Sequence, residues 1–172
     1  MNPSAATRPE SAGDLPGIRA VVQAAFGQPN EADLVDALRR ADALILSAVA
    51  VIDDRIVAHL AFSPVTIQSP AAATPALALA PVGVDPAHQN QGIGSALIRW
   101  GLAESARMGH GIVIVLGEPV FYGRFGFKPA SLYGIECPFP APPEAFMALE
   151  LAPGAAARCR GTVRYRPEFG LV

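Results

Sequence analysis

The most informative segment of the chain is Val82-Gly83-Val84-Asp85-Pro86-Ala87-His88-Gln89-Asn90-Gln91-Gly92-Ile93-Gly94-Ser95. An apolar strand ends at Val84, a polar turn follows, and Gly92 and Gly94 open a segment with helical periodicity. The start of a helix presents N–H groups without intrahelical acceptors together with the positive end of the helix dipole, and glycines let a phosphate approach the backbone. The stretch therefore predicts a strand–turn–helix unit that binds an anion, with a preference for pyrophosphate.

Two common phosphate-binding motifs do not fit this turn. A dinucleotide fingerprint needs Gly or Ala where Leu97 stands, and a Walker loop needs a lysine after its glycines, which this turn lacks. A nucleotide-binding domain of another fold is therefore disfavoured. The plain alternative is a tight turn whose small residues serve packing alone, because short glycine motifs also occur without a ligand.

Helices and strands are predicted to alternate on both sides of this unit. Asp14 is a suitable N-cap for the first helix, and Asp53-Asp54-Arg55 is typical of a hairpin between two strands. We expect helices over 15–26, 31–40 and 92–108 with a short one near Pro119, strands over 44–52, 56–67, 77–84, 112–116, 146–151 and 162–165, and irregular segments over 69–74 and 131–143. This order favours an α/β fold with a mixed sheet.

Composition narrows the class of protein. The 172 residues are 51% hydrophobic and 16% charged, as in a folded domain, and we expect one domain over 1–172. A net charge of −2 without a Lys/Arg tract disfavours a nucleic-acid partner. The chain has neither a secretory signal nor an apolar run of the ~20 residues that a membrane span needs. We therefore expect a cytoplasmic protein without a membrane partner, whose Cys137 and Cys159 remain reduced.

A second motif follows at residues 121–127. The spacing Gln89-x-x-Gly92-x-Gly94, after the Val-x-Val strand end, resembles the acetyl-CoA signature of the GCN5-related N-acetyltransferases, the GNAT superfamily. The segment Phe121-Tyr122-Gly123-Arg124-Phe125-Gly126-Phe127 resembles the Tyr-x-x-x-Gly-Phe element of that family. The two motifs stand in the family's order, and the resemblance extends from the first helix to the last strand. Within the family, the chain looks most like a bacterial branch of predicted N-acetyltransferases.

The resemblance implies a fold and a set of cofactor contacts. The fold would be a single α/β domain whose central mixed, largely antiparallel sheet is splayed between the strand ending at Val84 and strand 112–116, with acetyl-CoA in the gap. Val82, Gly83 and Val84 would offer backbone groups to the pantetheine arm, and an N–H near Val84 would hold the thioester oxygen. The residues that would wrap the pyrophosphate are Gln89, Asn90, Gln91, Gly92, Ile93, Gly94 and Ser95.

Tyr122 is the candidate general acid. Transfer of an acetyl group from a thioester to an amine requires a proton for the leaving thiolate, and a tyrosine supplies one at neutral pH because its reference pKa is about 10. The resemblance places Tyr122 in this role. The alternative is an aromatic core residue that packs beside Phe121 and Phe125.

The base that accepts the proton of the amine is less well defined. Strand 112–116 carries no acidic residue, and Gly117-Glu118-Pro119 stands where an asparagine is often found in the family. By residue type and intrinsic pKa, His59 and Glu31 are candidates, with Glu118 and ordered water as further options. The structural alternatives are a buried histidine in a strand and solvated charges at helix starts.

Two functions fit these observations. The first is an acyltransferase that moves the acetyl group of acetyl-CoA to an amine acceptor by direct attack, with Tyr122 as general acid. The alternative is a non-catalytic acyl-CoA-binding or sensing module, because the usual base positions are vacant. His88 and His110 form no cluster with other ligands, so we expect no metal. The sequence leaves open whether the acceptor is a small molecule or a protein, whether another acyl group is preferred, and whether the chain forms a homodimer.

Overall fold

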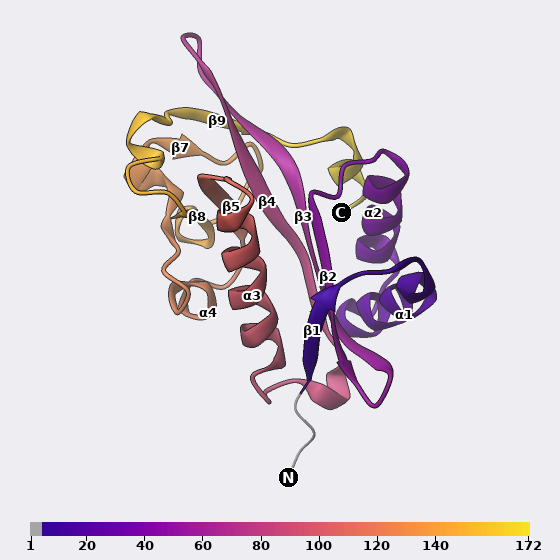
Figure 1. Ribbon diagram of the computed structural model, residues 1–172. Helices are drawn as coiled ribbons and strands as arrows, with labels where there is room; N and C mark the ends of the chain where they lie inside the picture. Colours follow the sequence, from indigo (N-terminus) through magenta and orange to yellow (C-terminus); the bar gives the residue numbers. More distant parts are fainter. Residues whose placement is uncertain (1–4) are drawn as a thin grey trace. The chain divides into compact units, whose positions relative to one another are not determined.

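The computed structural model describes residues 5–172, in which helices and strands alternate along the chain (Figure 1). The helices are α1 (Leu15–Phe26), α2 (Asn30–Arg40), α3 (Ile93–Arg107) and α4 (Pro119–Gly123). The strands are β1 (Ala6–Pro9), β2 (Leu46–Ile52), β3 (Arg55–Gln68), β4 (Ala73–Val84), β5 (Ile112–Leu116), β6 (Lys128–Pro129), β7 (Ile135–Glu136), β8 (Phe146–Glu150) and β9 (Gly161–Arg164). Short 3-10 turns connect them: η1 (Ala12–Asp14), η2 (Pro86–His88), η3 (Ala130–Tyr133), η4 (Pro143–Ala145), η5 (Ala156–Arg158) and η6 (Pro167–Leu171).

The strands form a mixed sheet, mostly antiparallel, in the order β1-β2-β3-β4-β5-β8-β6, and β9 pairs with both β3 and β7. Parallel pairing occurs between β4 and β5 and between β7 and β9, whereas the pairs β1–β2, β2–β3, β3–β9, β5–β8 and β6–β8 are antiparallel. The register of β4 on β5 consists of Leu77 opposite Val113 and Ala78 opposite Ile114. In contrast, β5 pairs with β8 along all of Ile112–Leu116. The predicted mixed, largely antiparallel sheet is confirmed. The parallel pairing of β4 with β5 extends over two residue pairs, as expected of strands that splay apart.

The described chain divides into two compact units, of which the first comprises residues 5–63, 80–103 and 167–172. Its core joins α1 and α2 to β2 through Ile18, Val21, Val22, Ala32, Val35 and Val49. Because side chains alternate along a strand, Phe62 of β3 points to the face opposite Val49. There α3 packs so closely that a Cβ atom at Gly101 would lie 2.8 Å from the Phe62 ring. This unit therefore has helices on both faces of its strands.

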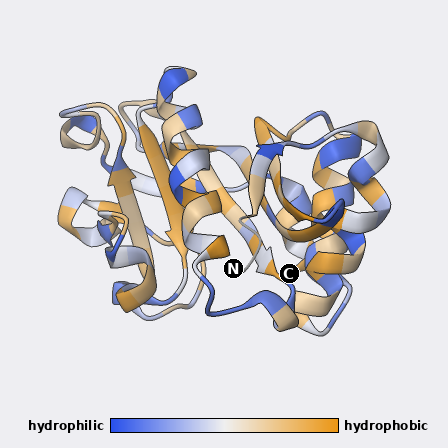
Figure 2. Cartoon of the chain, turned by 60° about the horizontal axis from the view of Figure 1, so that its bottom comes forward, coloured by the Kyte–Doolittle hydropathy of each residue, from blue (hydrophilic) through white to orange (hydrophobic). Residues whose placement is uncertain are grey.

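The second unit comprises residues 64–79 and 104–166. Its centre is β5, which is buried from Ile112 to Val115, as its unbroken apolar sequence predicts. Its antiparallel partner β8 is buried from Phe146 to Ala148. Figure 2 shows mainly apolar colours on the strands, whereas the helices alternate between apolar and polar residues.

Several elements differ from the sequence-based expectations. The strand β1, the two-residue strands β6 and β7, and the extension of β4 back to Ala73 were not predicted. Such short or exposed segments lack the alternation that marks a half-buried strand, and their partners lie far away in sequence. Asp14 precedes α1 as expected, but its carboxylate does not cap that helix. It accepts hydrogen bonds from the Arg8 guanidinium (2.6 and 2.9 Å) and from Ser11 instead.

Candidate functional site

The turn after β4 is held by its own polar groups. The Asp85 carboxylate accepts a hydrogen bond from the Ala87 N–H (2.9 Å), and the Asp85 N–H donates to the carbonyl of Val57 (2.9 Å). The Gln89 side chain donates from Nε2 to the carbonyl of Val84 (3.1 Å), so the end of β4 and the start of the turn are tied together. These bonds fix a loop whose residues Gln89 to Gly92 are otherwise exposed.

The helix α3 begins at Ile93, within one residue of Gly92, as predicted. Gly92 has a φ of +81°, a conformation that favours glycine, and its carbonyl accepts the helical hydrogen bond from Ala96 (2.9 Å). Ile93 is buried and anchors the first turn, whereas Gly94 is only half-buried. A Cβ atom at Gly94 would lie 3.1 Å from Cγ2 of Val84, so the helix start and the end of β4 lie in close contact. The turn therefore places exposed residues and a glycine at the N-terminus of α3, an arrangement that can accept an anion.

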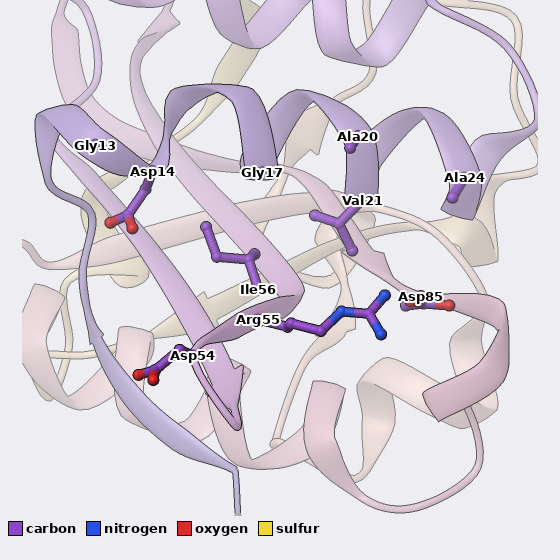
Figure 3. A pocket seen from close by; sticks show the side chains of 10 residues that line it. All are labelled: Gly13, Asp14, Gly17, Ala20, Val21, Ala24, Asp54, Arg55, Ile56 and Asp85. Atoms are coloured by element: carbon purple, nitrogen blue, oxygen red, sulfur yellow. The ribbon is translucent and has the colours of Figure 1, made fainter.

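A pocket of about 460 Å³ in the first unit adjoins the end of β4. Figure 3 shows small side chains of α1 along one wall and the Arg55 side chain extending towards Asp85. The residues that line it are Gly13, Asp14, Gly17, Ala20, Val21, Ala24, Asp54, Arg55, Ile56 and Asp85. The Asp14 carboxylate is already paired with Arg8. The remaining charged groups at this pocket are the carboxylates of Asp54 and Asp85 and the Arg55 guanidinium, which suit a cationic or zwitterionic molecule.

Tyr122 lies in α4 of the second unit and is half-buried. Its ring makes edge contacts with Phe121 (centroids 5.0 Å apart) and Phe127 (5.7 Å) and a tilted one with Phe125 (6.4 Å). Burial raises the pKa of Tyr122 to about 12, so its hydroxyl remains protonated across the physiological range. The ring is thus oriented by aromatic neighbours, and the phenol is a persistent proton donor.

The residues between β5 and α4 explain the departure from the asparagine expected there. Gly117 follows β5, and a Cβ atom at this position would overlap the Tyr122 ring. Glu118 is the N-cap of α4, and its carboxylate accepts a hydrogen bond from the Phe121 N–H (2.7 Å). Glu118 therefore serves the start of the helix, and the ring of Tyr122 occupies the space that a side chain at position 117 would need.

Comparison with known proteins identifies the family. The model of the acetyltransferase (GNAT) domain matches residues 6–130. The uncharacterized N-acetyltransferase YhbS of Escherichia coli strain K12 is 34% identical over 157 residues, which cover 91% of this chain and 93% of YhbS. This chain belongs to the GNAT acetyltransferase family.

Solved GNAT structures agree in fold. The crystal structure of E. coli YhbS in complex with CoA has a TM-score of 0.92 and 33% identity, and the match covers 99% of this chain and 94% of that one. A GNAT family acetyltransferase from Brucella melitensis, solved with acetyl-CoA, has a TM-score of 0.80 and 37% identity, with 96% and 97% covered. The predicted single α/β GNAT fold is confirmed by these matches.

In this GNAT chain, His59 lies in a buried polar network of the first unit. Its side chain is completely buried, and Nε2 lies 2.8 Å from Oγ of Ser47. Ser47 in turn hydrogen-bonds to Glu10, which receives two bonds from Arg39 (2.9 and 3.0 Å). Because an ionised carboxylate only accepts, the Ser47 hydroxyl donates to Glu10 and its oxygen accepts from His59 Nε2–H. The lone pair is then on Nδ1, which is buried without a hydrogen-bond partner.

Electrostatics in this network oppose a role for His59 as a base. Burial lowers the pKa of His59 to about 4, so the imidazole is neutral, and neither ring nitrogen faces solvent. Burial raises the pKa of Glu10, but hydrogen bonds from Arg39 and Ser47 outweigh this effect and hold that pKa below its usual value. The geometry favours a structural role for His59, because a general base must reach the proton that it removes.

Glu31 stands in the first turn of α2 and is half-buried. Its carboxylate oxygens each accept from Nε2 of Gln28 at 3.1 Å. This position suits the helix dipole, yet it leaves the carboxylate within reach of solvent. Of His59 and Glu31, Glu31 is therefore the more accessible candidate for the base.

The sequence alone does not mark Ser47 or Arg39 as partners of His59, nor Gly117 as a contact of Tyr122. Ser47 and Arg39 lie on different elements from His59, so no spacing along the chain connects them. The sequence did contain a hint at Gly117, because glycine stands there in place of the expected asparagine. The reason is visible only in the structure, in which the Tyr122 ring fills the space that a side chain would need.

The described residues 5–172 contain neither a membrane-spanning helix nor a metal-binding cluster. None of the helices there is both long and apolar enough to cross a membrane. In the same part of the chain, His, Cys, Asp and Glu side chains nowhere gather in the groups of three that a metal ion needs.

Proposed function

We propose that this protein is an N-acetyltransferase that moves the acetyl group of acetyl-CoA to an amine by direct attack. The observation that carries the proposal is the open glycine turn at the start of α3, in a chain of the GNAT family. Relatives with this fold have been solved with CoA and with acetyl-CoA, which supports the same co-substrate here.

The residues present fit acetyl-CoA. The exposed residues Gln89, Asn90, Gln91 and Gly92, followed by Ile93, Gly94 and Ser95, would wrap the pyrophosphate with main-chain N–H groups at the positive end of α3. Gly94 matters because the close approach of Val84 leaves little room for a side chain beside a phosphate. The segment Val82, Gly83 and Val84 would offer its backbone to the pantetheine arm, and an N–H there would hold the thioester oxygen.

Tyr122 would protonate the departing thiolate. With a pKa of about 12, the phenol is a weaker acid than a thiol of pKa about 8.5, so a complete transfer from Tyr122 alone is uphill. Transfer becomes favourable when the tyrosinate regains a proton in the same step. The attacking nitrogen supplies this proton, because it must lose one proton to become an amide.

The whole reaction then conserves atoms and charge. The neutral amine attacks the thioester carbonyl, a C–N bond forms, and the negative charge on oxygen is held by backbone N–H groups. On collapse, the C–S bond breaks, sulfur takes the proton of Tyr122, and the proton lost by nitrogen restores the phenol through water. Glu31 is the side chain proposed to assist the loss of that proton, because His59 is completely buried.

The test of activity is thiol release from acetyl-CoA across a panel of amines. The panel should emphasise cationic and zwitterionic amines, because Asp54, Asp85 and Arg55 line the pocket beside β4. Release that depends on one amine, with the acetylated product identified by mass spectrometry, supports an enzyme. Tight CoA binding without turnover for any class of amine, protein N-termini included, would favour the sensing alternative.

Tyr122→Phe tests the general acid. The change removes one oxygen and keeps the ring, so kcat should fall by about 10²- to 10⁴-fold, the usual contribution of a positioned acid. The KM for acetyl-CoA should change little, because its proposed contacts come from other residues. The measurement uses saturating acetyl-CoA with an amine that the wild type acetylates, together with a melting curve. Wild-type turnover in a folded Tyr122→Phe variant would remove Tyr122 from the mechanism.

A further inference from the structure

We propose that Gly117 is a positioning residue for Tyr122: it carries no side chain so that the phenol ring can lie against the end of β5. This inference rests on the proposed role of Tyr122. A Cβ atom at position 117 would lie 2.9 Å from Cδ2 and 3.4 Å from Cζ of Tyr122, and closer still to Cε2. Cζ bears the hydroxyl, so any side chain here presses on the edge of the ring that carries the proposed proton donor.

The backbone on both sides of this contact is fixed. The Gly117 N–H donates to the carbonyl of Ala145 (2.9 Å), and the Glu118 carboxylate caps α4 through the Phe121 N–H (2.7 Å). Gly117 also lies outside the left-handed region that favours glycine, so its φ does not exclude an alanine. With the main chain held, the end of the tyrosine side chain is the part that gives way.

The aromatic neighbours limit where the ring can move. Phe121 and Phe127 meet it edge-on, with centroids 5.0 and 5.7 Å away, and Phe125 lies at 6.4 Å. A methyl group at position 117 must therefore shift the hydroxyl away from its present location rather than rotate the ring in place. A misplacement of about 1 Å in a reacting group can cost about 10²-fold in rate, so the effect should appear in the chemical step.

The experiment compares Gly117→Ala with Gly123→Ala. Gly123 ends the same short helix, and an added Cβ atom there meets nothing within 4 Å, so it controls for the loss of a glycine. We expect Gly117→Ala to lower kcat by about 10²-fold while the KM for acetyl-CoA stays near that of the wild type. Gly123→Ala should keep wild-type kcat. Equal kcat values for the two variants would overturn the proposal.

A double-mutant cycle separates positioning from a general loss of structure. If Gly117 acts only through the Tyr122 hydroxyl, Gly117→Ala should cost less than about twofold in a Tyr122→Phe background. The same fold-loss in both backgrounds would contradict the inference. The cycle also distinguishes the two failures: wild-type turnover in Tyr122→Phe rejects the general acid, whereas an impaired Tyr122→Phe beside an active Gly117→Ala rejects only the role of Gly117.

A second readout does not depend on turnover. In protein labelled with fluorotyrosine, ¹⁹F NMR reports on Tyr122, Tyr133 and Tyr165. Gly117→Ala should shift the Tyr122 resonance and leave the other two in place, and Gly123→Ala should shift it far less. An unmoved Tyr122 resonance would show that the ring does not yield to the added methyl group and would overturn the proposal.

Discussion

At the scale of single residues, the two glycines at the start of α3 act for different reasons. Gly92 is required by its backbone, which has a φ of +81°. Gly94 lies in close contact with its neighbour, because a Cβ atom there would stand 3.1 Å from Cγ2 of Val84 at the end of β4. The first glycine shapes the turn. For the second, we propose that the missing side chain leaves room for a phosphate.

The second role predicts that Gly94→Val weakens CoA binding. The added side chain keeps the proposed phosphate from the helix N-terminus, so the affinity should fall by about 10- to 100-fold, equivalent to one hydrogen bond to a charged group. Titration calorimetry with CoA measures this. Ala96→Val adds a branched side chain on an exposed position of the same helix and should bind as the wild type does. Equal affinity of the Gly94 variant and the wild type would reject the turn as the binding site.

At the scale of elements, the Glu10–Ser47–His59 network ties β1, β2 and β3 together, and Arg39 brings in α2. Because burial lowers the pKa of His59 from 6.5 to about 4, the unfolded chain binds more protons than the folded one between these values. The contribution of neutral His59 to the free energy of unfolding is therefore fully present above pH 6.5, and it is lost as the pH falls towards 4.

This linkage predicts that the free energy of unfolding drops by about 3 kcal/mol between pH 7 and pH 4 on account of His59. Urea unfolding at several pH values measures the drop. His59→Gln should flatten the pH dependence in this window, and His110→Gln, outside the network, should leave it unchanged. If His59→Gln does not fold, ¹H NMR of the wild type replaces it: an imidazole that titrates near pH 6.5 would contradict the prediction.

At the scale of the whole molecule, residues 167–172 belong to the same unit as residues 5–63. After β9, η6 packs on α2, and Phe169 is 8% exposed, whereas Leu171 is 46% exposed. Phe169 is thus part of the core of the first unit, whereas Leu171 lies at its surface.

The C-terminal contact predicts a large loss of stability for Phe169→Ala. Removal of a buried phenylalanine ring should lower the free energy of unfolding by about 3–5 kcal/mol. Leu171→Ala shortens an exposed side chain of the same turn and should change the free energy of unfolding by only about 0.5 kcal/mol. Urea denaturation of both variants measures the difference. Similar losses in the two variants would show that the C-terminal turn is not docked as described.

The elements that sequence predicted correctly carry strong local signals. The helix at Ile93 follows from its glycines and periodicity, β5 from its apolar run, and the hairpin at Asp53-Asp54 from turn residues that adopt positive φ values in the structure. The pair of motifs also identified the GNAT family, because both consist of residues whose spacing is set by one turn or one helix.

Long-range arrangement depended on tertiary packing. The short strands β6 and β7 form by pairing with β8 and β9, which lie far along the chain. The length of the β4–β5 pairing likewise depends on how these two distant strands are aligned. His59 was a candidate base by residue type, yet packing buried it against Ser47 and lowered its pKa. Local sequence determines backbone conformation and intrinsic chemistry, whereas burial and partners from distant elements determine whether a titratable group is charged and can be reached.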